Sequence, residues 1–220
     1  PLAGEKQVAW TAPMDSEVIK YAKNRLGATV NDVLMACASG ALRRFLEGQG
    51  GEIGREFNVS MPVNIRPPNA PLKLENRFAA VPLQLPAGIV GLAERVGAVK
   101  ARMDALKRSV EPIVVYGIQG ALLRMLPQGM SRGLIDFLAN KCTAVVTNVP
   151  GPQGIVRLAG SRVRSMVFWV PQRARIGLGI SVLSFAGKVQ VGIIADRRVV
   201  PDVDELVGDF EAEFEVLQSL

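Results

Sequence analysis

The sequence predicts an α/β (α+β) fold in which helices flank a mixed β-sheet, and three observations predict it. Several segments alternate bulky residues with small or polar ones at a period of two, as strands do. Other segments are amphipathic and begin at helix-capping residues. Two of the strands are separated only by a tight turn, whereas others are separated by helices, so antiparallel and parallel neighbours are expected together. We expect residues 1–220 to form a single domain.

The clearest strand pair lies in Ile176–Asp202. In residues 176–182 bulky side chains alternate with Gly or Ser, and in residues 188–193 Val and Ile alternate with Lys, Gln and Gly. We expect the turn at Ala186–Gly187, because Gly can adopt a positive φ. One face of this hairpin is bulky and belongs to a core, whereas the other face is bare. Such a bare face indicates the close approach of either another packed element or a ligand. The bare positions are Gly177, Gly179, Ser181 and Gly192.

The other elements follow from periodicity and capping. Further strands are expected at residues 7–11, 57–65, 78–85, 142–147 and 163–168. Helices are expected at residues 16–26, 30–47, 91–108, 112–127 and 130–140, and from residue 203 to about residue 217. Thr29 and Asp32 resemble a capping box, and Asp202 suits the N-cap of the last helix. Pro62 predicts an edge or an irregularity in its strand. Gly40 and its small neighbours predict close packing of the second helix on a sheet.

Composition limits the chemistry. The chain has a net charge of +6 and a sequence pI near 9.7, which suits an anionic partner, although a solvated basic surface explains the charge equally well. The same two interpretations apply to the basic helix around residues 100–108. No run of Lys and Arg is interleaved with aromatic residues, which argues against nucleic-acid binding. No apolar run reaches the roughly 20 residues of a membrane span.

The sequence contains no histidine. This excludes His general bases, Ser-His-Asp and Cys-His catalysis, and His metal ligands within the chain. Cys37 and Cys142 lie far apart in apolar surroundings and offer no metal site, so buried free thiols are expected. The chain starts at Pro1 without a Met, so we expect it to be a piece of a longer intracellular protein, and no signal peptide is expected.

Five sequence blocks occur in order: NDVLMA (31–36), PVNIRP (62–67), ENRFAAVPLQLP (75–86), TNVPGP (147–152) and IIADRRVVPD (193–202). Together they resemble the C-terminal half of the bacterial wax ester synthase/diacylglycerol acyltransferases, in the CoA-dependent acyltransferase superfamily. The resemblance covers residues 4–217. It implies one half of a chloramphenicol acetyltransferase-like two-domain fold, with a tunnel between the halves. It also implies that the N-terminal acyltransferase domain is a partner, in the same gene product or in a separate chain.

The resemblance implies transfer of a fatty acyl group from acyl-CoA to diacylglycerol or a long-chain alcohol, by attack of the acceptor hydroxyl on the thioester. The general base is a His in an HHxxxDG motif of the N-terminal half, so no catalytic residue is expected in this chain. No permanently bound cofactor is expected, and acyl-CoA is a substrate. A cytoplasmic location is implied, with the inner membrane or lipid inclusions as peripheral partner surfaces. Two alternatives stay open: a non-catalytic half-domain that binds a partner or a lipid surface, and an enzyme that acylates polyketide or glycolipid hydroxyls.

Supporting roles also follow from the resemblance. Arg66 is expected to hold the Asp of HHxxxDG through a bidentate ion pair, with Asn64 ordering the same strand end; an ordinary loop-edge Arg is the alternative. Thr147 and Asn148 could donate hydrogen bonds to an oxyanion, or serve only the turn that follows them.

Two further sets of residues have competing explanations. Asn31 and Asp32 match the family's ND motif, but helix capping explains them locally and is favoured. The bare hairpin face is expected either to line the acyl or pantetheine tunnel or to receive a closely packed helix.

Overall fold

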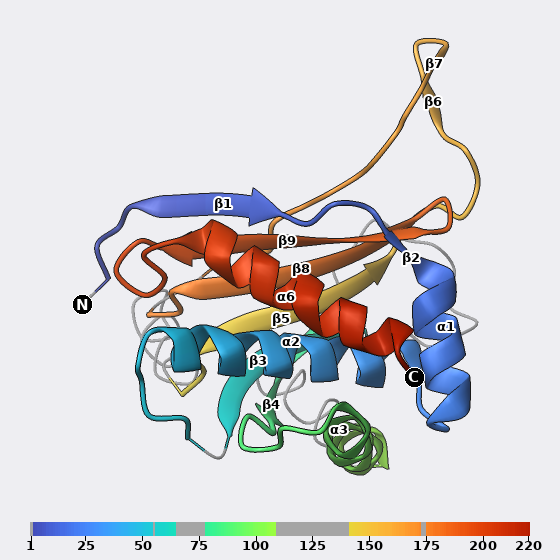
Figure 1. The fold of residues 1–220 in the computed structure, drawn as a ribbon. Helices are drawn as coiled ribbons and strands as arrows, with labels where there is room; N and C mark the ends of the chain where they lie inside the picture. Colours follow the sequence, from blue (N-terminus) through green and yellow to red (C-terminus); the bar gives the residue numbers. More distant parts are fainter. Residues whose placement is uncertain (1, 55, 65–77, 109–140, 173–174) are drawn as a thin grey trace, which may run out of the picture.

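The computed structural model describes residues 2–54, 56–64, 78–108, 141–172 and 175–220 (Figure 1). Its centre is a seven-stranded mixed sheet in the order β1-β9-β8-β5-β3-β4, with β2 also paired to β9. Strands β3, β5 and β8 are parallel, and the pairs β3–β4, β8–β9, β1–β9 and β2–β9 are antiparallel. The predicted mixed sheet is therefore confirmed. The strands are β1 (Lys6–Trp10), β2 (Met14–Asp15), β3 (Phe57–Asn64), β4 (Phe78–Leu85), β5 (Ala144–Pro150), β8 (Leu178–Phe185) and β9 (Lys188–Asp196).

Helices cover one face of this sheet. They are α1 (Ser16–Arg25), α2 (Val30–Gly48), α3 (Leu92–Arg108) and α6 (Val203–Gln218). Helix α2 is central, since it packs against α6, α3 and α1, and every residue from Asp32 to Leu42 is buried. A helix that is buried all round explains why α2 carries small and apolar residues on every side. In Figure 1, α2 and α6 cross the front of the sheet side by side.

The predicted caps are present. Thr29 and Asp32 form a reciprocal capping box at the start of α2, Asp15 caps α1, and Asp202 caps α6. The hairpin turns at Ala186–Gly187, where both residues have positive φ. The β3–β5 ladder joins only Val59 and Ser60 to β5, and Pro62 lies just beyond its end, which accounts for a proline in an inner strand.

The structure differs from the sequence expectations at two places. Residues 163–168 are not a strand; they follow a short hairpin formed by β6 (Arg157–Leu158) and β7 (Ser161–Arg162) and run without a ladder partner. Gly40 does not meet the sheet, because its neighbours are Glu213 of α6 and Arg95 of α3. The helices expected at residues 112–127 and 130–140 lie outside the described residues.

Candidate functional site

The parallel strands β3, β5 and β8 end at one edge of the sheet, where open α/β sheets bind their ligands. Asn148 lies near the end of β5, and Asn31 lies in the first turn of α2. The Asn148 Nδ2 donates a hydrogen bond to the Asn31 Oδ1 at 2.6 Å, across 117 residues of sequence. Two residues predicted separately are thus brought into direct contact, and this contact joins the start of the central helix to the end of a central strand.

Asp32 takes part in the capping box at the N-terminus of α2. The Thr29 amide donates to the Asp32 Oδ2 at 2.8 Å, and the Asp32 amide donates to the Thr29 Oγ1 at 3.2 Å. The Asp32 side chain is fully buried, and its Oδ1 has no hydrogen-bond partner among the described residues. The favoured structural explanation for Asp32 is therefore confirmed, and any role in substrate binding stays a prediction.

Thr147 and Asn148 point to opposite faces of β5, because consecutive strand residues alternate. Thr147 is buried and lies opposite Ser181 of β8, on the face away from the helices, whereas Asn148 is half-buried beside α2. A single oxyanion on one face cannot receive hydrogen bonds from both side chains. The two side chains therefore face opposite sides of β5, and the oxyanion role expected of Thr147 and Asn148 stays a prediction.

Arg66 lies outside the described residues. Asn64 ends β3 opposite Phe78, at the same edge as Asn148, and only its backbone is described. The roles predicted for Arg66 and Asn64 stay predictions.

The bare face of the β8–β9 hairpin is covered by the chain's own residues 167–170. The Ser181 hydroxyl hydrogen-bonds to the carbonyl oxygens of Phe168 and, at 2.9 Å, of Gly192. A Cβ at Gly179 would lie 2.8 Å from Val170 Cγ1, and one at Gly192 would lie 3.0 Å from Val167 Cγ2. Close packing therefore explains the missing side chains, although an irregular segment and not a helix supplies it.

Gly177 follows the same pattern at the end of the hairpin, where a Cβ would meet Val199 and Leu2. The structure thus gives the four bare positions a packing explanation. The tunnel-lining role predicted for them stays a prediction, without support from this packing.

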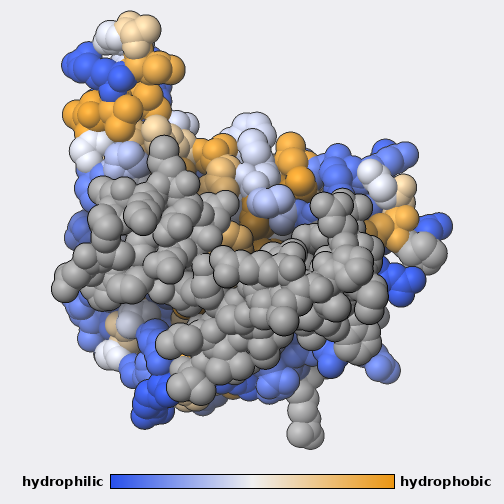
Figure 2. Space-filling view, turned by 180° about the vertical axis from the view of Figure 1, so that it is seen from behind, coloured by the Kyte–Doolittle hydropathy of each residue, from blue (hydrophilic) through white to orange (hydrophobic). Residues whose placement is uncertain are grey.

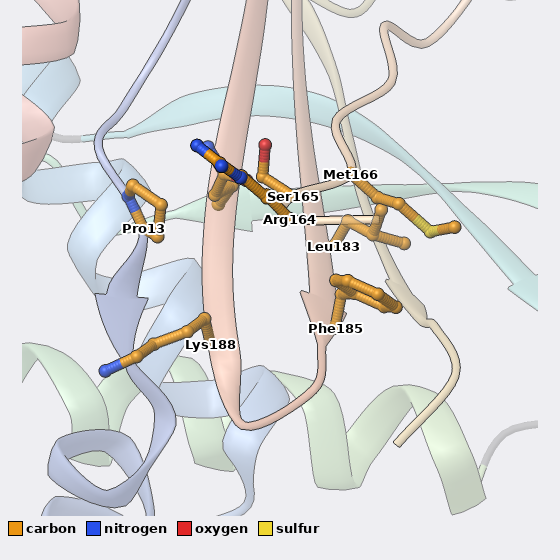
Figure 3. A pocket seen from close by; sticks show the side chains of 8 residues that line it. Pro13, Arg164, Ser165, Met166, Leu183, Phe185 and Lys188 are labelled. Carbon is orange, nitrogen blue, oxygen red and sulfur yellow. The ribbon is translucent and has the colours of Figure 1, made fainter. Parts of the chain in front are cut away.

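Two hollows in the described part of the molecule differ widely in size. The first has a volume of about 10 Å³, which suits a single water and is too small for an acyl chain. Figure 3 shows Arg164, Phe185 and Lys188 among its lining side chains. The second, of about 490 Å³, lies between β3, β4 and α3 and is lined in part by Leu83 and Arg102. Neither is lined by a predicted site residue.

A buried charge cluster joins the three helices α2, α3 and α6. Arg95 is 1% exposed; its guanidinium pairs with Glu213 and donates to the Ala36, Ile89 and Val90 carbonyls at 2.9–3.1 Å. The Arg44 Nε pairs with the other Glu213 oxygen at 2.6 Å.

These ionic groups were not predicted from the sequence. A signal existed, since Glu213 falls on the helical face shared by Phe210, Phe214 and Leu217, where an acidic residue indicates a buried partner. Burial lowers the pKa of Arg95, and the adjacent Glu213 carboxylate opposes this shift.

The cations of the basic helix α3 are largely occupied within the chain. Lys100 and Lys107 pair with Asp104 at 2.7 and 3.5 Å, and Arg102 pairs with Glu56 at 2.6 Å. These contacts favour the interpretation as a solvated helix face. In the described ranges, no helix is both long and apolar enough to cross a bilayer.

Similarity to solved structures identifies the fold. A wax ester synthase/diacylglycerol acyltransferase from Marinobacter aquaeolei VT8 superimposes with a TM-score of 0.72 at 19% identity, over 99% of this chain and 49% of that one. The PapA2 acyl transferase superimposes with a TM-score of 0.61 at 13% identity, over 99% and 47% of the two chains. These matches confirm the predicted fold class.

Sequence relatives point to one family. Two proteins of Mycobacterium tuberculosis (strain H37Rv), described as proposed diacylglycerol O-acyltransferases, are 29% and 30% identical to this chain over 99% and 81% of its length. The matched regions span 44% and 37% of those relatives. The family model described as "WS/DGAT C-terminal domain" matches residues 74–218. The chain belongs to the family of wax ester synthase/diacylglycerol acyltransferase C-terminal domains.

Proposed function

We propose that this chain is the C-terminal half of an acyltransferase that moves a fatty acyl group from acyl-CoA to the hydroxyl of diacylglycerol or a long-chain alcohol. The observation that carries the proposal is the family match over residues 74–218. It is supported by the relatives that carry the name diacylglycerol O-acyltransferase and that match nearly the whole chain over less than half of their own length.

In this proposal the acceptor hydroxyl attacks the thioester carbonyl, and its proton passes to a His of an N-terminal half, since this chain has none. The tetrahedral intermediate then collapses to the ester, the C–S bond breaks, and CoA leaves as a thiol that takes the proton from this His. The tetrahedral oxyanion needs fixed hydrogen-bond donors. Asn148 is the better candidate of the β5 pair, because its amide has a second N–H beyond the one given to Asn31. The Asn31 contact would hold this amide in one orientation.

Arg66 has a positioning role in the proposal. Its guanidinium would form a bidentate ion pair with the Asp of the HHxxxDG motif, through two parallel hydrogen bonds. This pair would fix the position of the loop that carries the catalytic His. The support is its place two residues after Asn64, the last residue of β3, at the edge where Asn31 and Asn148 meet. No contact with substrate is assigned to it.

The test is Arg66→Ala in the complete enzyme. We expect kcat to fall by about 10²-fold or more, because misplacing a general base by about 1 Å has effects of this size. KM for acyl-CoA should change little, since Arg66 touches no substrate. Arg66→Lys should recover only part of the rate, because an ammonium lacks the bidentate fork.

The matched control is Arg25→Ala, an exposed α1 residue whose guanidinium reaches only the Tyr21 hydroxyl in the described part of the chain. It should leave turnover unchanged. Unchanged turnover in the Arg66→Ala enzyme would rule out the positioning role.

A further inference from the structure

One buried carboxylate binds the residues that lead into β1. Asp196, the last residue of β9, is fully buried. Its Oδ1 accepts a hydrogen bond from the Ala3 amide, and its Oδ2 accepts one from the Gly4 amide, each at 2.9 Å. Two consecutive backbone amides that converge in this way form a concave site for an anion. Gly4 has a φ of +84°, a conformation that glycine adopts without strain. These two hydrogen bonds are here called the Asp196 clamp.

Further contacts compensate the charge of Asp196. The Arg198 amide donates to the Asp196 Oδ1 at 3.1 Å, and the Lys6 ammonium lies 3.9 Å from the Oδ2. Burial raises the pKa of Asp196, but the three amide hydrogen bonds and the charge of Lys6 lower it more, so the net pKa lies below its ordinary value. Asp196 is therefore an anion at neutral pH, and the clamp consists of charge-assisted hydrogen bonds.

Other contacts fix the same stretch of chain, residues 2–5, here called the entry segment. The Arg197 amide donates to the Glu5 carbonyl at 3.0 Å. Leu2 packs over Gly177, where an added Cβ would lie 2.9 Å from the Leu2 Cδ2. The ladder between β1 and β9 begins only at Lys6. The clamp therefore holds chain that precedes the sheet, and the strand pairing of β1 does not depend on it.

The entry segment and the candidate site lie at opposite edges of the sheet. Strands β1 and β8 both pair with β9 in antiparallel orientation, so β1 runs in the same direction as β8 and β5. The chain thus enters where the parallel strands begin, whereas Asn148 lies near the edge where they end. Figure 1 shows the N-terminus and the connection from β9 to α6 together at one end of the sheet. The eight residues of β8 span about 26 Å between the two edges.

This separation makes the direction of the entering chain important for the chemistry. A rotation of about 5° at the entry segment displaces a group at the far edge by about 2 Å, and a misplacement of about 1 Å is enough to slow a reaction about 10²-fold. A fixed entry segment therefore limits the error with which groups from a preceding half reach the edge at Asn148.

We propose that Asp196 is a positioning residue of the acyltransferase: by clamping the entry segment, it fixes the direction in which the N-terminal half joins this domain. The inference rests on the proposed function, in which that half supplies the His. Asp196 acts through the chain that it binds, and no contact with substrate is assigned to it.

The test is Asp196→Asn in the complete enzyme. An amide has a single acceptor oxygen, and its NH2 group would face a backbone N–H, so the clamp opens. We expect kcat to fall at least about ten-fold, whereas KM for acyl-CoA should change little. Hydrogen exchange of the Ala3 and Gly4 amides should accelerate at least about ten-fold, whereas the amides of α2 should keep their protection.

A second variant opens the clamp from the other side. Ala3→Pro removes the amide hydrogen that the Asp196 Oδ1 accepts, at an exposed residue, and leaves Asp196 unchanged. It should lower kcat as Asp196→Asn does, and it decides the question if Asp196→Asn fails to fold. Asp202→Asn is the matched control on the same connection. Asp202 caps α6 by accepting from the Asp204 amide at 3.0 Å, and asparagine caps a helix about equally well, so kcat should be unchanged.

A short flexible Gly-Ser insertion immediately before Pro1 separates positioning from support of the local fold. The insertion loosens the connection to the N-terminal half but leaves the clamp intact. If the clamp acts by positioning, the insertion and Asp196→Asn remove the same constraint. The combined variant should then lose no more activity than the more damaging single change. Effects that multiply would show that Asp196 only supports its own domain, and they would overturn the proposal.

The remaining outcomes are equally decisive. Unchanged kcat in Asp196→Asn and Ala3→Pro would overturn the proposal, as would an equal loss in Asp202→Asn. A complete wild-type protein without acyl transfer would count against the proposed function. Small-angle X-ray scattering would then still test the clamp. We expect a larger radius of gyration for Asp196→Asn than for the wild-type protein, and equal values would overturn the positioning role.

Discussion

At the scale of single residues, burial determines what each polar group can do. Cys37 is fully buried in α2 near the Arg95–Glu213 pair. Desolvation, assisted by the Glu213 carboxylate, raises the pKa of the Cys37 thiol to about 12. A thiol is a nucleophile only as its thiolate, so Cys37 is inert at neutral pH. Cys142 is half-buried and free, and burial raises its pKa as well.

The Cys37 shift predicts a pH dependence of stability. The folded thiol keeps a proton that the unfolded thiol loses above pH 9, so the contribution of Cys37 is present below pH 9 and is lost between pH 9 and pH 12. The slope is at most about 1.4 kcal/mol per pH unit. Urea unfolding of Cys37→Ala should show a weaker decline of the unfolding free energy from pH 8 to pH 10 than wild type. Cys142→Ala should keep most of the decline, and identical slopes in all three proteins would contradict the assignment.

Asn31 and Asn148 were identified from the sequence, but the contact between them could not be predicted. The resemblance of short blocks identified both residues, but nothing in their neighbourhoods indicates that they meet. The meeting depends on the register of β5 and on the place of α2 against the sheet, which long-range packing determines. The opposite directions of Thr147 and Asn148 could have been predicted, because alternation along a strand needs no tertiary information.

At the scale of elements, α2 organises the helical layer. The charge cluster on its surface links α3 and α6, and Gly40 makes room for it. An ion pair this deeply buried contributes more to the specificity of packing than to stability. Breaking it is nevertheless destabilising, because it leaves a buried charge without its partner.

Gly40→Ala tests this arrangement. The added methyl would collide with the Glu213 carboxylate and the Arg95 guanidinium. These groups cannot move aside easily, because Arg95 also binds three carbonyls and Glu213 also binds Arg44. We expect the free energy of unfolding to fall by about 1–3 kcal/mol.

The same substitution at Gly97 of α3 is the control. An added Cβ there has open space, so Gly97→Ala should be neutral or raise stability by up to about 1 kcal/mol through helix propensity. Denaturant unfolding monitored by circular dichroism compares the two variants. Equal effects would contradict the packing described around Gly40.

Local signals were sufficient for most elements. Capping residues and periodicity predicted α1, α2 and α6, because nearby side chains satisfy the free backbone groups at helix ends. Periodicity alone predicted α3. The strand expected at residues 163–168 was wrong for a physical reason. Its alternation of side chains is compatible with an extended chain, but a strand also needs the backbone of a partner strand. This segment instead crosses the bare face of β8–β9, where the Ser181 hydroxyl hydrogen-bonds to the Phe168 carbonyl.

At the scale of the whole molecule, buried apolar groups and exposed groups occupy separate parts of the fold. The helices and the sheet form a closed core, whereas the short hairpin of β6 and β7 (Figure 2) and the edge at Asn31 and Asn148 present apolar and polar groups outward. Composition alone showed the positive charge but not its position in the fold. The missing histidine was the sequence observation with the widest consequence, because it removes the usual general base from this chain.

An acyl-transfer assay with labelled acyl-CoA and either diacylglycerol or a long-chain alcohol tests the proposed function most directly. It compares the complete enzyme with the 220-residue chain alone. The proposed function requires that the complete enzyme form triacylglycerol or wax ester and that the isolated chain form neither, since its general base lies elsewhere. Transfer by the isolated chain, or no transfer to either acceptor by the complete enzyme, would contradict it.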